Sequence, residues 1–151
     1  MFAAAALRMI GYPPLIVDME AKNDDDHVIA IFKDNDRWGA VAKSNTTLLR
    51  FREPVYKSLR ELVMSYFEMY FNTKGYKSLR TYSRPVNLAR FDNRDWMTTD
   101  EDLEFIGDYL YKRPHIKILS NDEIKKLRQA DKDIMKACFL GSNAAGLFKP
   151  Q

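Results

Sequence analysis

The sequence predicts a single α+β domain in which an antiparallel β-sheet packs with helices. Two apolar runs, Val28 to Phe32 and Trp38 to Ala42, flank a polar turn and are typical of a β-hairpin. After Pro54, apolar residues recur at helical spacing. The 151 residues are 46% hydrophobic, enough to bury one core and too few to require two. We therefore expect one domain over residues 1–140 and a flexible tail over 141–151.

The chain begins with an alanine-rich segment that is expected to be helical over residues 2–10, because alanine has the highest helix propensity. Gly11 can adopt the left-handed conformation that ends a helix. No Ser, Thr, Asp or Asn caps the start, so we expect the first turn of this element to lie upstream. A short buried strand follows from Leu15 to Met19, and residues 23–26 are read as a turn.

Both hairpin strands are apolar at consecutive positions, which indicates a sheet covered on both faces. Leu48 to Arg52 extends the sheet or forms its edge, and Pro54 is predicted to start a helix that ends near residues 72–75. The segment 79–88 contains Pro85 and is interpreted as an edge strand or an extended loop. The remaining predicted elements are a helix over 101–112 capped by Thr99 or Asp100, a strand over His115–Leu119, and a last helix that is capped by Asn121 or Ser120 and runs to about Leu140.

Composition and charge exclude several classes of function. The 24 basic and 21 acidic residues are spread along the chain, so the net charge of +3 indicates a mixed surface and argues against nucleic acid as a partner. No window approaches the roughly 20 apolar residues that span a bilayer, and no signal peptide is recognisable. One cysteine and two distant histidines cannot form a disulfide or a usual zinc site, which favours the cytoplasm and predicts no metal or cofactor.

The only arrangement that suggests chemistry is the pairing of His27 with the end of the second hairpin strand. A four-residue loop at 34–37 would place His27 opposite Ser44, and a three-residue loop at 35–37 would place it opposite Asn45. Opposed residues have Cβ atoms about 4.5–5.5 Å apart, so the Asn45 amide could orient the imidazole, as the third member of a thiol triad does. The alternative is that His27 merely begins a strand beside a polar turn.

Other candidate groups have simpler structural interpretations. Cys138 is expected in the last turn of its helix, where the negative end of the dipole raises a thiol pKa, and its apolar neighbours indicate a core position. Three consecutive aspartates at 24–26 are more often solvated than metal-bound, and the turn at 34–36 lacks the ligand spacing of a calcium loop. The arginines that could form an anion patch are scattered through a loop region and are expected to be solvated: Arg80, Arg84, Arg90 and Arg94.

The order of these segments resembles the transglutaminase-like branch of the papain-like cysteine enzymes, in an uncharacterised bacterial form. The segments FAAAALRMIGYPPLIVDM, DDDHVIAIF and RWGAVAKSN are similar to that superfamily's succession of helix, strand, His-bearing strand and strand ending in Asp or Asn. The resemblance covers roughly residues 2–92. It implies a papain-like core over about residues 1–100, and a helical C-terminal part over about 100–140.

The resemblance also implies a mechanism and a missing part. In the family a thiolate at the start of the first helix attacks an amide or ester carbonyl, the histidine acts as base, and Asp or Asn orients it. Carried over by position, His27 would be the base and Asn45 the orienting residue, with Ser44 as an alternative neighbour. The cysteine has no counterpart, so the chain resembles an N-terminally truncated member and is expected to be inactive, a pseudoenzyme.

Two functions follow from these expectations. The first is a thiol acyl-transfer or amide-hydrolysis domain that retains only the His27 and Asn45 part of its site. The second is a non-catalytic module that uses the same fold to bind a protein or peptide. Protein or peptide partners and self-association through an exposed sheet or helix surface are expected, and membrane partners are not.

Overall fold

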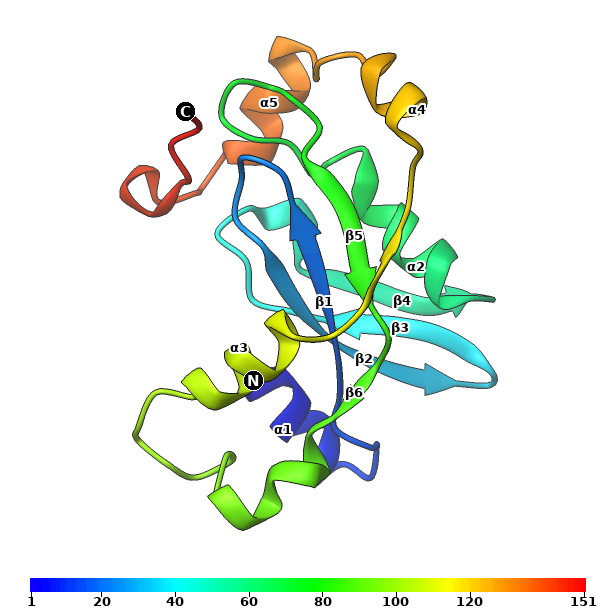
Figure 1. The fold of residues 1–151 in the computed structure, drawn as a ribbon, viewed down its shortest axis with the longest axis vertical. Coiled ribbons are helices and arrows are strands. Elements are labelled where there is room, and N and C mark those ends of the chain that lie inside the picture. The colour runs from blue at the N-terminus through cyan, green and yellow to red at the C-terminus, as the bar shows by residue number, and fades with distance from the viewer.

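The computed structural model describes residues 1–151 and shows an α+β protein built on one antiparallel sheet (Figure 1). The strand order is β4-β3-β2-β1-β5-β7, and the short β6 pairs with β1 beyond β5. The strands are β1 (Leu15–Ala21), β2 (His27–Asp34), β3 (Arg37–Val41), β4 (Phe51–Tyr56), β5 (Leu79–Ser83), β6 (Val86–Asn87) and β7 (His115–Lys117).

Helices flank this sheet on both of its faces and at one end. The α-helices are α1 (Phe2–Met9), α2 (Leu59–Phe67), α3 (Glu104–Tyr111), α4 (Asn121–Lys125) and α5 (Lys132–Phe139), and the 3-10 turns are η1 (Thr47–Leu49), η2 (Leu88–Arg94) and η3 (Ala144–Gly146). None of the helices has the length and apolar character needed to cross a membrane.

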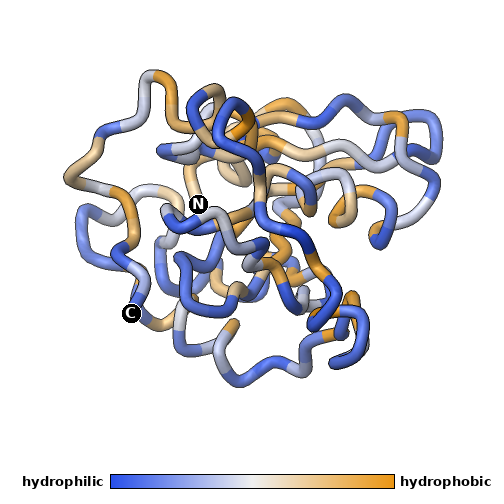
Figure 2. The backbone as a smooth tube through the Cα atoms, turned by 90° about the horizontal axis from the view of Figure 1, so that it is seen from above, coloured by the Kyte–Doolittle hydropathy of each residue, from blue (hydrophilic) through white to orange (hydrophobic).

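The two faces of the sheet bury separate hydrophobic clusters. Ile29 and Ile31 of β2 point into a cluster with α2, which we call the α2 core. Ala30 points the other way, into a cluster with α1 and α3 that we call the α1 core. Because side chains alternate along a strand, this arrangement confirms that the hairpin strands are covered on both faces. Figure 2 shows hydrophilic stretches mainly in the outer loops.

The hairpin forms in the first of the two registers considered. Asp34 pairs with Arg37, and Ala30 pairs with Val41, so the turn residues are Asn35 and Asp36. Both turn residues have positive φ angles, 44° and 59°, as a two-residue turn of the type that matches strand twist requires. Continued further, this register would place His27 opposite Ser44, but β3 ends at Val41.

The predicted helix at Pro54 is wrong in its boundaries. Pro54 lies in β4, an edge strand in which a residue without an N–H costs no ladder hydrogen bond. The helix begins at Leu59 because the Ser58 side chain caps it, accepting a 3.1 Å hydrogen bond from the Glu61 N–H. It ends at Phe67, well before residues 72–75. The apolar residues that continue the pattern are still buried, in the turn beyond the helix.

The C-terminal third also differs from its prediction in detail. The single helix expected from Asn121 to Leu140 is two helices, because Asp131 caps a new start by accepting from the Asp133 and Ile134 N–H groups. The helix expected over 101–112 begins only at Glu104, with no side-chain cap. β5 is an interior strand between β1 and β7, not an edge, and Pro85 falls after it, outside the ladder.

Candidate functional site

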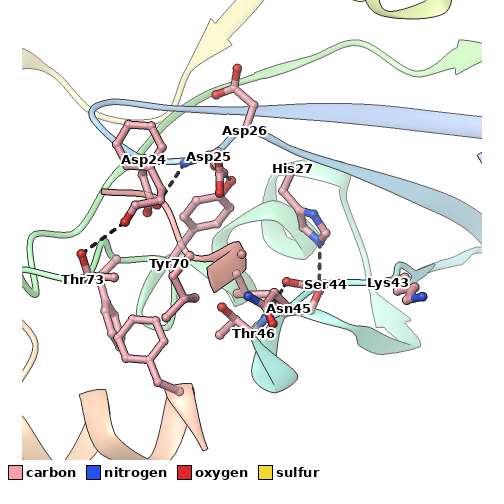
Figure 3. Close-up of a pocket in the computed structure, with 16 residues that line it drawn as sticks. Asp24, Asp25, Asp26, His27, Lys43, Ser44, Asn45, Thr46, Tyr70 and Thr73 are labelled. Carbon is pink, nitrogen blue, oxygen red and sulfur yellow. Dashed lines mark hydrogen bonds between the residues drawn. The ribbon is translucent and has the colours of Figure 1, made fainter. Parts of the chain in front are cut away.

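A cavity of about 290 Å³ lies at one end of the sheet, on the face of the α2 core. The start of β2, the loop from β3 to η1 and the turn after α2 form three sides, and the segment from α5 to the C-terminus forms the fourth (Figure 3). The lining residues are Asp24, Asp25, Asp26, His27, Lys43, Ser44, Asn45, Thr46, Leu49, Tyr70, Phe71, Thr73, Phe139, Gly146, Leu147 and Phe148.

His27 is the first residue of β2 and is held by a backbone carbonyl. It pairs with Met19 of β1, a residue of the α2 core, so its ring is on that face. Its Nε2 lies 3.2 Å from the Leu49 carbonyl oxygen. A carbonyl only accepts, so Nε2 carries a proton and Nδ1 is unprotonated in the neutral ring. Burial lowers the pKa of His27, against the Leu49 hydrogen bond that raises it, and this favours the neutral form.

Asn45 lines the same cavity but has a different partner. Its Nδ2 donates to the Asn143 carbonyl over 2.9 Å, and its Oδ1 accepts from the Asn143 N–H over 2.8 Å. The structure therefore brings His27 and Asn45 to one cavity without a hydrogen bond between them. Ser44 shapes the loop instead of contacting the ring, because its Oγ accepts from the Thr46 N–H over 3.1 Å.

The C-terminal segment is fastened across the cavity at three places. Beyond the Asn45 contacts, Thr73 Oγ1 donates to the Phe148 carbonyl over 3.3 Å. Asn23 then repeats the two-point contact, donating to the Gln151 carbonyl over 3.2 Å and accepting from the Gln151 N–H over 3.1 Å. We expected a loose tail over 141–151. The small and polar residues of this segment gave no sign of these contacts in the sequence.

The aspartates at 24–26 form a wall of the cavity that is tied to the core. Asp24 Oδ2 accepts from the buried Ser78 hydroxyl over 2.6 Å, and the Asp25 carbonyl accepts from the Tyr70 hydroxyl over 2.7 Å. Burial raises the pKa of Asp24, in opposition to the Ser78 hydrogen bond. Across the whole protein, no group of three or more His, Cys, Asp or Glu side chains could hold a metal ion.

No thiol faces the histidine. Cys138 is buried in the last turn of α5, where its Sγ lies 3.8 Å from the Met69 Sδ, and burial raises the pKa of its thiol. The first helix, α1, packs its Ala4 into the α1 core. A group at the start of α1 would therefore lie on the opposite face of the sheet from the ring of His27.

The sequence did not single out a second polar cluster on the α1 face. Asp18, Ser83 and His115 lie in a row across β1, β5 and β7, because Ser83 pairs with His115 and its Oγ accepts from the Asp18 N–H over 3.0 Å. Ser83 is fully buried, so its hydroxyl has a structural role. The only feature of the sequence that could have indicated this cluster was His115 at the start of a predicted strand. Its neighbours Asp18 and Ser83 come from distant parts of the chain.

Comparison with models of known protein families and with curated proteins gives no match. The resemblance to transglutaminase-like enzymes is therefore still a prediction, and the geometry of the cavity is the basis for assigning a function.

Proposed function

We propose that this protein is a non-catalytic module that binds an extended peptide segment in the cavity beside His27. One observation carries the proposal, namely the way the chain's own residues 143–151 lie there. Asn45 and Asn23 each contact both the N–H and the C=O of one tail residue. Contacts of this kind read the peptide backbone and tolerate different side chains.

The cavity walls define which peptide would fit. Phe71 and Phe139 lie edge to face, with ring centroids 5.8 Å apart, beside the tail residues Leu147 and Phe148. The aspartates at 24–26 supply negative charge on the neighbouring wall. We expect a ligand with an apolar or aromatic residue next to a basic one, as in the tail's own Phe148-Lys149.

Thiol acyl transfer, the function implied by the resemblance, has less support from this geometry. The Leu49 carbonyl, not the Asn45 amide, holds the imidazole. The side-chain amide that would orient a catalytic histidine is committed to the tail. We therefore favour the peptide-binding alternative and treat His27 as part of the wall.

A competition experiment tests the proposal. A fluorescent peptide with the sequence of residues 141–151 is titrated into the full-length protein and into a chain ending at Leu140. The shortened chain is expected to bind the peptide. The full-length protein is expected to bind it at least about tenfold more weakly, because a tethered segment competes at an effective concentration on the order of millimolar.

Matched variants of the shortened chain locate the contact. Asn45→Asp keeps the acceptor for the peptide N–H but loses the donor, and should weaken binding about fivefold. Asn93→Asp, at an exposed position in η2, should leave binding unchanged. The proposal fails if the shortened chain has the circular dichroism spectrum and thermal transition of the full-length protein and still does not bind the peptide.

A further inference from the structure

A second cavity, of about 360 Å³, is lined by residues at β5, at β7 and in α4, and positive side chains dominate its lining. In Figure 1 the yellow segment that leads up to α4 runs along β5, with which β7 pairs. Lys22, Arg80, Lys117 and Lys125 contribute four cationic groups, and no carboxylate lines it. These residues come from three strand regions and one helix, so only the fold brings them together. This cavity is separate from the cavity beside His27 and shares no lining residue with it.

Three of the four cationic residues at this cavity form no ion pair, although Glu20 accepts a hydrogen bond from the hydroxyl of the lining residue Thr81 over 2.5 Å. Lys22, Arg80 and Lys117 take part in none of the ion pairs of the structure. Lys125 pairs with Asp122 over 3.0 Å, but those side chains are 76% and 82% exposed, and such pairs are weak. A concave site with one sign of charge attracts and concentrates ligands of the opposite sign.

Arg80 is the only one of the four cationic residues that is partly buried. Its Nη1 donates to the Leu79 carbonyl over 2.8 Å, while its Nε is buried and has no hydrogen-bond partner. Burial also lowers the pKa of Arg80. Because Nε has almost no accessible surface, a ligand in the cavity would contact the other nitrogens of the guanidinium. A guanidinium presents several donors in a geometry that matches oxyanions. The site therefore has the chemistry to bind an oxyanion.

We propose that this cavity binds a small phosphate monoester. Three lysines and a partly buried arginine suit a doubly charged phosphoryl group better than a single carboxylate. Leu119 and Ile124 provide an apolar wall that a bare phosphate ion would not use. The volume lies within the roughly 300–1,000 Å³ of small-molecule sites, which leaves room for an organic group beside the phosphate.

Titrations of the full-length protein, followed by amide chemical shifts, test this assignment. Phenyl phosphate should shift the signals of Arg80, Thr81 and Lys117 and bind at least about tenfold more tightly than inorganic phosphate or phenol. Equal affinity for inorganic phosphate, or for phenol, would overturn the organic phosphate ligand. Tighter binding of a single-stranded oligonucleotide at the same residues would assign the site to a nucleic acid and overturn it as well.

Variants distinguish binding in this cavity from a non-specific attraction between the ligand and the positive charges of the protein. Arg80→Gln should weaken phenyl phosphate binding about tenfold or more, and the exposed Lys117→Gln should weaken it several-fold, without a change in fold. The matched control, Arg84→Gln, removes an exposed arginine just beyond the end of β5 that does not line the cavity. If Arg84→Gln weakens binding as much as Arg80→Gln and Lys117→Gln do, the proposal is wrong.

Discussion

Each of the two histidines of this chain begins a strand of the sheet, and the two have different kinds of partner. His27 is the first residue of β2, and His115 is the first residue of β7. The Nε2 of His27 faces the Leu49 carbonyl at 3.2 Å, whereas the Nε2 of His115 faces the Asp18 carboxyl group at 3.3 Å. One ring is held by the backbone and the other by an ionisable side chain.

The two rings also differ in the hydrogen-bond roles of their nitrogen atoms. The Nδ1 of His115 lies 2.9 Å from the Arg113 carbonyl and must donate to it. A hydrogen bond between Nε2 and Asp18 then needs a further proton, on the ring or on the carboxyl group. Burial raises the pKa of Asp18, in opposition to the charge of His115 and the hydrogen bond to it, which lower it. His27 needs no such proton, so the histidine that the sequence singled out has the simpler chemistry.

The largest expected effect is the loss of the carboxyl partner of His115. Asp18→Ala leaves the His115 side chain, which is only 13% exposed, without its partner. The substitution should therefore lower the free energy of unfolding by about 2 kcal/mol. Urea denaturation measures this. The control is Asp122→Ala, which removes an 82% exposed partner of Lys125 and should cost almost nothing. Equal losses in the two variants would contradict a structural role for the buried pair.

The second prediction concerns the pH dependence at His27. Because its pKa is lowered in the folded protein, the unfolded chain binds more protons near the ordinary histidine value of about 6.5. The stability due to neutral His27 is complete above that pH and is lost as the pH falls from there through the lower pKa of the folded protein. The stability advantage over His27→Gln should therefore shrink as the pH falls through this range. An advantage that stays constant would contradict the burial of the ring.

A smaller effect is expected at the rim of the His27 cavity. Asn45→Ala removes both contacts with Asn143 and should speed hydrogen exchange of the Asn143 amide about fivefold, as the loss of one net hydrogen bond would. Asn93→Ala should leave this exchange rate unchanged. A protected Asn143 amide in the Asn45 variant would show that other contacts hold the tail.

The smallest expected effect is on thiol chemistry, where we predict none. Cys138 should react slowly with iodoacetamide at neutral pH, because its thiol is buried and its pKa is raised. His27→Ala should not change the rate, and no thiol-dependent turnover is expected. Fast labelling that depends on His27, or a catalytic rate abolished by His27→Ala, would restore the catalytic hypothesis and end the contrast between the two histidines.

Much of the fold could be predicted from local sequence. Gly11 has the left-handed φ of 96° expected at the end of the first helix, and the hairpin has one of the two registers considered. The errors arose where a local signal was ambiguous. Proline at position 54 is compatible with a helix start or an edge strand, and the cap at Ser58 decided between them. An internal aspartate, Asp131, similarly divided one apolar pattern into two helices.

The candidate site could be predicted only in part. His27, Ser44 and Asn45 were identified together because they are close on one hairpin, and they do line one cavity. Their hydrogen-bond partners, Leu49 and Asn143, could not be foreseen, since a backbone carbonyl has no sequence signature and Asn143 is 98 residues from Asn45. The four cations of the second cavity are similarly dispersed, and sequence reasoning treated Arg80 as one of several solvated arginines.

By itself, the sequence determined the α+β class, the hairpin and the burial of both sheet faces, because apolar periodicity and turn residues act over a few neighbouring positions. The tertiary structure alone decided that β5 is an interior strand, that the tail lies across the cavity, and that His115 meets Asp18. Those outcomes depend on contacts between segments far apart in the chain, whose energies come from burial and from pairing with groups that no local pattern specifies.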